Sequence, residues 1–220
     1  MVKENLERVR DRIRQAAERA GRDPKAVRLV AVTKEADIEQ VKEAIEEGVT
    51  DIGENRVKDT VFKKELLDSH VLTWHMIGHL QTNKARDAVK LFSVIHSVDS
   101  IKLVHIIDKD AEKIKKVQDI LIEVNVSGEQ SKFGINLEVL EGFLEETRHL
   151  RHVNTLGLMT MAPFADNAET TRPYFKKLKE LADKHNLKEL SMGMTQDFEV
   201  AVEEGATMVR IGSAIFRGVS

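Results

Sequence analysis

Short apolar runs alternate along this chain with longer segments whose apolar residues recur every three or four positions, and this alternation constrains the fold most strongly. Val41, Ala44 and Ile45, ahead of Gly48, illustrate the helical segments. Apolar runs without polar alternation are typical of strands covered on both faces, as in parallel sheets. The predicted strands are Val27–Thr33, Val49–Ile52, Val71–His75, Phe92–Ile95, Val117–Val124, Val153–Leu158, Leu190–Met192 and Met208–Ile211.

Eight strands separated by helices predict an α/β fold, a TIM-type (β/α)8 barrel with an extra N-terminal helix. That first helix contains Leu6, Val9 and Ile13 at helical spacing and ends at Gly21. A doubly wound open sheet is the alternative, because strand order along the chain does not show closure. No Gly/Ser-rich or Pro-rich linker divides the 220 residues, so residues 1–220 are expected to form one domain.

The composition argues against several classes of function. The 34 basic and 37 acidic residues leave a net charge of −3, which gives no electrostatic reason to expect nucleic acid or a membrane surface as partner. The chain has no cysteine, which excludes disulfides and thiolate chemistry. No signal peptide opens the sequence, and no uncharged apolar stretch approaches the ~20 residues that span a bilayer. We expect a cytoplasmic protein.

Lys34 comes directly after the first predicted strand, where barrels and α/β sheets place their chemistry. A lysine that is partly removed from water there becomes a nucleophile toward carbonyl groups. Taken alone, the segment favours a solvated lysine at a strand end, because most lysines are solvated. The last two strands favour the chemical interpretation.

Small and hydroxyl residues follow the seventh and eighth predicted strands, where barrels commonly bind phosphate. Ser191 lies in the seventh strand, two residues ahead of Gly193, and Gly212 and Ser213 follow the eighth strand, with Arg210 two residues ahead of Gly212. Glycine amides and hydroxyl groups are suitable donors to an anion. A nucleophilic lysine with a phosphate site indicates pyridoxal 5′-phosphate (PLP), or an aldolase that acts on a phosphosugar.

Six sequence blocks decide between these two interpretations, because together they resemble the pyridoxal phosphate homeostasis proteins, single-domain barrels related to the N-terminal domain of alanine racemase. The resemblance covers essentially the whole chain. The blocks are Ala31-Val32-Thr33-Lys34, Gly53-Glu54-Asn55, Trp74 to Lys84, Gly157-Leu158-Met159-Thr160-Met161, Leu190 to Asp197 and Val209 to Phe216.

The resemblance implies a PLP site. It places the Schiff base with the cofactor on Lys34 and the phosphate donors at Ser191, Gly212 and Ser213. Arg210 resembles the racemase arginine that bonds the pyridine nitrogen. We also expect cofactor contacts from Met192, beside Ser191, and from Asn55 and His75, which match residues that line the mouth of the barrel.

Two functions remain in competition. The resemblance implies a non-enzymatic protein that binds, buffers and delivers PLP, with the cofactor and apo-enzymes as partners. The alternative is a PLP-dependent amino-acid racemase, which needs acid/base groups on both faces of its substrate. In the full-length racemase, a tyrosine from a second domain of the partner subunit supplies one of these groups. Here the single tyrosine, Tyr174, lies in a predicted helix, so we expect a carrier, and a monomer.

Three other features are interpreted as structural. His75 and His79 are four residues apart, but no third ligand is evident, so we expect no metal site. The basic cluster Arg148 to His152 lacks interleaved aromatic residues and is interpreted as solvated surface. The polar segment Gly128 to Gly134 is either a mobile lid over the mouth or an ordinary connection between strand and helix.

Overall fold

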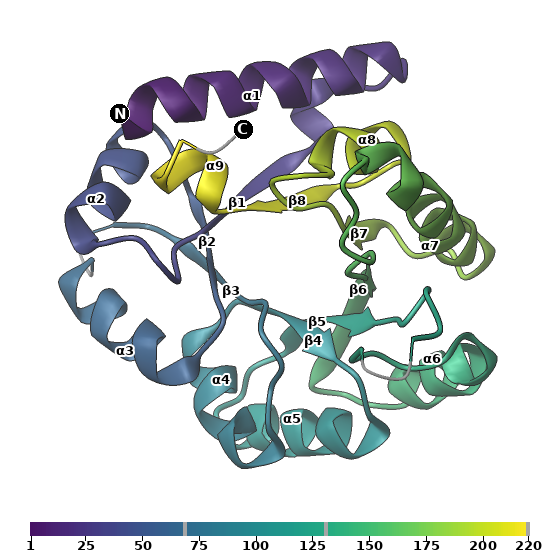
Figure 1. Cartoon of the computed structure of the whole chain (residues 1–220). Helices are drawn as coiled ribbons and strands as arrows, with labels where there is room; N and C mark the ends of the chain where they lie inside the picture. The colour runs from purple at the N-terminus through teal and green to yellow at the C-terminus, as the bar shows by residue number, and fades with distance from the viewer. Residues whose placement is uncertain (68–69, 130–131, 219–220) are drawn as a thin grey trace.

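The computed structural model describes residues 1–67, 70–129 and 132–218. Eight parallel strands form a closed barrel, because β1 pairs with β8 as well as with β2 (Figure 1). The closure confirms the TIM-type barrel and excludes the open sheet. The strands are β1 (Arg28–Val32), β2 (Asp51–Glu54), β3 (Thr73–Met76), β4 (Val94–Val98), β5 (Gln118–Glu123), β6 (Val153–Met159), β7 (Glu189–Ser191) and β8 (Met208–Ile211).

Helices follow the strands and form the outer ring of the barrel (Figure 1). They are α2 (Ile38–Glu46), α3 (Val57–Leu66), α4 (Ala85–Leu91), α5 (Ile101–Lys113), α6 (Leu140–Arg148), α7 (Arg172–Lys184), α8 (Phe198–Glu203) and the short α9 (Ser213–Phe216). Short 3-10 turns lie at Pro24–Ala26, Thr82–Lys84, Leu137–Val139 and Ala168–Thr171.

The extra N-terminal helix is α1 (Val2–Arg19), as the sequence predicts. It lies against α2, α8 and α9, so the first and last helices of the described chain lie side by side on the barrel (Figure 1). Leu6, Val9 and Ile13 are buried on its inner face. Gly21, with φ of 65°, ends the helix in the left-handed conformation that glycine adopts without strain.

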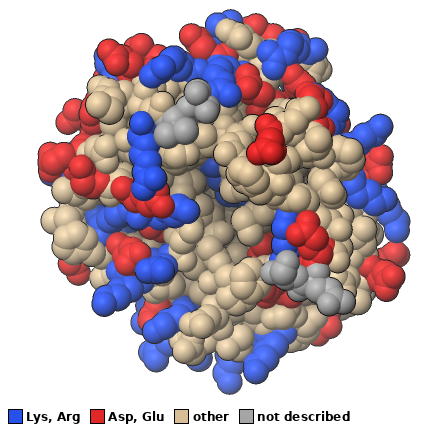
Figure 2. Space-filling model, in the orientation of Figure 1, with Lys and Arg blue, Asp and Glu red and all other residues tan. Residues whose placement is uncertain are grey.

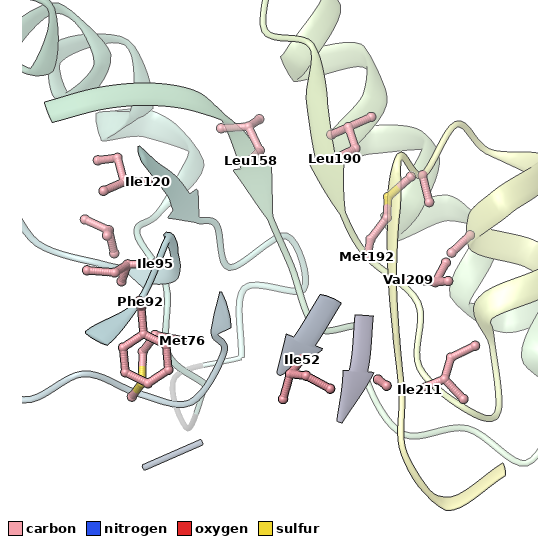
Figure 3. Close-up of a cluster of buried hydrophobic side chains, with 14 of the residues drawn as sticks. Ile52, Met76, Phe92, Ile95, Ile120, Leu158, Leu190, Met192, Val209 and Ile211 are labelled. Atoms are coloured by element: carbon pink, nitrogen blue, oxygen red, sulfur yellow. The ribbon is translucent and has the colours of Figure 1, made fainter. Parts of the chain in front are cut away.

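The strand side chains separate into two hydrophobic layers. The larger layer lies between the sheet and the helices and includes Ile52, Met76, Ile95, Leu158 and Ile211 (Figure 3). The smaller layer is the barrel interior, formed by Val30, Val94, Leu121, Met159 and Met208. Because side chains alternate along a strand, a residue between two members of the outer layer points into the barrel.

That alternation makes much of the barrel interior polar. His75 lies between Trp74 and Met76, and Arg210 lies between Val209 and Ile211, all four flanking residues being in the outer layer. The same holds for Ser191, between Leu190 and Met192. All three polar side chains are buried. Burying such groups is costly unless they are hydrogen-bonded, so their partners define the interior of this protein.

Candidate functional site

Lys34 lies at the carboxyl end of β1, in a turn that the Ala36 amide closes by donating to the Thr33 carbonyl at 3.1 Å. Its side chain is exposed. Within residues 1–67, 70–129 and 132–218, its amine has no hydrogen-bond acceptor and no ion-pair partner. The position agrees with the sequence prediction, and the amine is accessible to a ligand above the barrel.

An ion pair beside Lys34 fixes the end of β1. Lys63 of α3 lies 2.5 Å from a carboxylate oxygen of Glu54, and it also donates to the Thr33 carbonyl. The Thr33 hydroxyl donates to the same Glu54 oxygen. Glu54 is fully buried and the Lys63 side chain is 12% exposed, so the pair ties β1, β2 and α3 together where little water competes. Lys63 is therefore engaged, whereas Lys34 is not.

The loops after β7 and β8 meet and bring two hydroxyl groups together. The Ser213 hydroxyl lies 3.0 Å from the Thr195 hydroxyl. Ser213 opens α9, whose first amides lack acceptors within the helix. Gly212 allows the turn to lie against β1, because a Cβ there would approach the Val32 carbonyl oxygen to 3.0 Å. Two hydroxyls and a helix start therefore adjoin the strand that leads to Lys34.

Arg210 lies deeper, inside the barrel. One guanidinium nitrogen donates to the Ser191 hydroxyl at 2.6 Å and another donates to the Thr160 carbonyl at 3.0 Å. Burial lowers the pKa of Arg210 to about 10, against the charges of Glu123 and Asp197, so the group stays protonated at neutral pH. Within the described residues, the other guanidinium N–H groups have no acceptor.

The structure separates two predicted residues from the mouth of the barrel. Met192 is fully buried in the outer hydrophobic layer, near Leu190 and Val209 (Figure 3), because strand alternation turns it away from Ser191. Its side chain therefore does not reach a ligand at the strand ends. His75 is not in the mouth either: its ring is fully buried in the interior, 2.9 Å from a carboxylate oxygen of Asp51.

The remaining predicted residues lie at strand ends. Asn55 follows β2 and is half-buried, and its backbone is packed against Gly78, where a Cβ would approach the Asn55 carbonyl oxygen to 2.4 Å. Lys34, Ser191, Arg210, Gly212 and Ser213 belong to the neighbouring strands β1, β7 and β8 or to the loops that follow them.

Sequence reasoning missed three residues near this site. Thr195 lay within a recognised block, but nothing in its spacing distinguished it from its neighbours. His96 lay just beyond the predicted fourth strand, which in fact continues to Val98. The sequence signal that could have identified His96 is a polar pair, His96 and Ser97, inside an otherwise apolar run. Glu123, the third, closes β5, whose predicted range ran over it as part of a buried strand.

Glu123 has an unusual electrostatic setting. The residue is 2% exposed. Burial and the nearby charge of Asp99 raise the pKa of its carboxyl to about 7, although the charge of Arg210 acts in the opposite direction. Burial also raises the pKa of Asp197, whose carboxylate accepts a hydrogen bond from the Met194 amide.

Figure 2 shows that the face carrying α9 is hollowed near its centre, with basic side chains on part of the rim.

The connections above β3 and β5 contact each other through an aromatic pair. The rings of His79 and Phe133 are stacked with centroids 4.0 Å apart, and His79 also lies 3.2 Å from Asp99. Residues 130–131 of the segment predicted as either a lid or an ordinary connection lie outside the described residues. In the described part of the chain, no three candidate ligands are grouped to hold a metal ion, and no helix is long and apolar enough to span a membrane.

Comparisons with known proteins cover nearly the whole chain. The sequence model described as the alanine racemase N-terminal domain matches residues 5–219. A pyridoxal phosphate homeostasis protein of Aquifex aeolicus (strain VF5) is 47% identical over 219 residues, covering 97% of this chain and 96% of the relative. The protein of the same name from Escherichia coli (strain K12) is 34% identical over 223 residues, covering 98% and 95%.

Solved structures agree with these relatives. PipY of Synechococcus elongatus PCC7942, solved with PLP bound, is 34% identical with a TM-score of 0.86, covering 98% of this chain and 100% of that chain. An alanine racemase from Clostridium difficile 630 is 15% identical with a TM-score of 0.75, covering 97% of this chain and 56% of the other, and shares the fold. By sequence over nearly its whole length and by its closed barrel, this chain belongs to the family of pyridoxal phosphate homeostasis proteins.

Proposed function

We propose that this protein binds PLP at the carboxyl ends of β1, β7 and β8, and buffers and delivers the cofactor inside the cell. The observation that carries the proposal is the Lys34 amine, which is accessible and has no partner among the described residues. Lys34 follows β1, the strand paired with β8, and the Thr195 and Ser213 hydroxyl pair lies in the loops after β7 and β8. The names of the relatives and the PLP-bound structure of PipY support the same ligand.

The residues present are suited to the three polar parts of PLP. The Lys34 amine would hold the aldehyde group, whose carbonyl carbon can condense with a primary amine and release water. Ser213, Thr195 and the amides around Gly212 donate to the phosphate. Arg210 would donate to the pyridine nitrogen and, as a group that only donates, would leave that nitrogen unprotonated. Asn55 adjoins the mouth from β2.

We assign the protein to cofactor carriage rather than to racemisation. An unprotonated ring nitrogen weakens the cofactor as an electron sink, and racemisation needs acid/base groups on both faces of the substrate. The single tyrosine, Tyr174, belongs to α7 and packs against the hydrophobic layer outside the barrel. Delivery to apo-enzymes, a monomeric state and a cytoplasmic location belong to the same proposal.

The covalent step is tested by absorbance and by borohydride trapping. Wild-type protein mixed with PLP is expected to gain a visible band, and reduction followed by peptide mass spectrometry is expected to place the adduct on Lys34. Lys34→Arg retains the charge but cannot form the C=N bond, so it should lose the band. Lys63→Arg is the matched control. A trapped adduct on another lysine in the wild-type protein would contradict the assignment.

The carrier role is tested separately in deuterated water. Holo-protein incubated with L-alanine is expected to show no α-deuteration at rates typical of enzymes, about 1–10³ per second. The same holo-protein is expected to restore activity to an apo-enzyme that requires PLP. Rapid exchange with formation of the D-isomer would make the protein a racemase.

A further inference from the structure

A continuous chain of buried polar side chains crosses the barrel interior from β2 to β8. Asp51 Oδ1 lies 2.9 Å from His75 Nε2, and His75 Nδ1 lies 2.8 Å from His96 Nε2. His96 Nδ1 lies 2.8 Å from the Ser191 hydroxyl, which lies 2.6 Å from Arg210 Nη1. The five hydrogen-bonded side chains therefore come from five different strands, β2, β3, β4, β7 and β8.

The chemistry of the two ends gives the chain one direction. A guanidinium only donates and a carboxylate only accepts. Ser191 accepts from Arg210, so its single proton is directed to His96 Nδ1. His96 then donates from Nε2 to His75 Nδ1, and His75 donates from Nε2 to Asp51. In this arrangement every proton has an acceptor, and both rings are the Nε2–H tautomer.

Both ends of the chain are fixed. Asp51 also accepts from the Thr50 hydroxyl at 2.7 Å. Although burial alone would raise the pKa of Asp51, hydrogen bonds from His75 and Thr50 and the charge of Arg28 lower it, so the carboxylate is ionised. Burial, together with the nearby positive charges, lowers the pKa of His96 well below its usual value, so the ring is neutral.

Four of the five side chains are 4% exposed or less, with His75, His96 and Ser191 fully buried. Water therefore does not compete for these hydrogen bonds, and each ring can turn only by breaking both of its contacts. At the Arg210 end, a ligand can bind only the guanidinium N–H groups that the protein leaves without an acceptor. Ser191 and the Thr160 carbonyl occupy two of the N–H groups and so set the plane of the guanidinium.

We propose that His96 is a positioning residue for the cofactor: through Ser191 it fixes the plane of Arg210, so that the guanidinium meets the ring nitrogen of PLP in one geometry. His75 and Asp51 fix His96 in turn. This inference rests on the proposed function, because it assumes that PLP is the ligand and that Arg210 faces its ring nitrogen.

The direction of the chain is tested first without cofactor. Nitrogen-15 NMR of histidine side chains in the ligand-free protein should show His75 and His96 as Nε2–H tautomers, with both Nδ1 atoms unprotonated. His96→Phe assigns the His96 signals by their loss. A protonated Nδ1 on His96 would overturn the proposed chain, whatever the protein binds.

The positioning role is tested with two ligands that differ only at the ring nitrogen. These are PLP and 1-deazapyridoxal 5′-phosphate, in which C–H replaces that nitrogen. His96→Phe is expected to weaken PLP about tenfold, the scale of one hydrogen bond to a charged group, and to leave the deaza compound unchanged. His96→Asn keeps an acceptor for Ser191 and should recover most of the affinity for PLP. Ser97→Ala, in the next buried position of β4, is the matched control.

The outcomes separate this inference from the proposed function. Equal weakening of both ligands by His96→Phe and His96→Asn would mean a structural role only, and no weakening of either would mean no role; both results overturn the inference. A wild-type protein that binds neither ligand would refute the proposed function itself, and the positioning role with it.

Discussion

The Ser191 hydroxyl accepts a hydrogen bond from the Arg210 guanidinium at 2.6 Å and lies 2.8 Å from His96 Nδ1. Both contacts are made inside the barrel, where Ser191 is fully buried. The hydroxyl is thus used to hold Arg210, whereas the Thr195 and Ser213 hydroxyls face each other between the loops. We therefore propose that the Thr195 and Ser213 hydroxyls bind the phosphate, whereas the Ser191 hydroxyl holds Arg210.

Thr195→Ala and Ser213→Ala are each expected to weaken PLP by about 1.5–3 kcal/mol, the range for a hydrogen bond to a charged group. Because pyridoxal lacks the phosphate, its affinity should stay the same in both variants. Ser191→Ala should instead weaken PLP and pyridoxal alike, since it acts through Arg210. Equilibrium dialysis with the two aldehydes measures all three variants, and a phosphate-selective loss in Ser191→Ala would return that residue to the phosphate site.

Glu123→Gln is expected to stabilise the protein at pH 8 and to leave it unchanged near pH 4. Because burial raises the pKa of Glu123 in the folded protein to about 7, from an ordinary value of 4.5, the unfolded chain releases this proton first as pH rises. Wild-type stability therefore falls between these two pH values, by about 1–3 kcal/mol. Urea unfolding across this pH range measures the effect. Glu112→Gln, on the exposed face of α5, is the matched control.

Lys63→Ala is expected to destabilise the fold by about 3–5 kcal/mol, because it leaves the Glu54 carboxylate buried without its cation. One Glu54 oxygen already has no partner in the described residues, so no other group there is ready to compensate. Urea unfolding compares it with Lys42→Ala, which removes an exposed pair with Glu39 and should cost less than about 1 kcal/mol. The double variant Glu54→Gln/Lys63→Met should be more stable than Lys63→Ala. A loss as small as that of Lys42→Ala would show that the buried pair contributes nothing.

Two glycine substitutions should act in opposite directions. A Cβ on Gly157 of β6 would lie 1.8 Å from the Glu189 carbonyl oxygen of β7, so Gly157→Ala forces the paired strands apart and should cost more than about 3 kcal/mol. Gly142 lies in α6 with open space around it, and Gly142→Ala should stabilise by about 0.5–1 kcal/mol. Thermal unfolding measures both, and a neutral Gly157→Ala would contradict the observed contact between β6 and β7.

The order of strands and helices was readable from the sequence, because hydrophobic periodicity is a local property of a few neighbouring residues. All eight predicted strands are present, and Met208–Ile211 has the predicted bounds. The fourth strand runs on from the predicted Ile95 to Val98, because it pairs with β5 again after an irregularity, as Val98 faces Ile122. Pairing of that kind depends on a neighbour and is not encoded in the strand alone.

The positions of Lys34, Gly212 and Ser213 followed from the sequence for the same local reason: each lies at the end of a recognisable strand. Closure of the barrel, the pairing of Thr195 with Ser213 and the route from His75 through His96 to Ser191 came only from the tertiary structure. These contacts join residues far apart in the chain, and a period-two pattern shows which side of a strand a residue faces but not which residue it meets there. The sequence by itself therefore determines which polar residues lie at the strand ends. The closure of the sheet decides which partners the buried polar groups meet, because those partners come from distant parts of the chain.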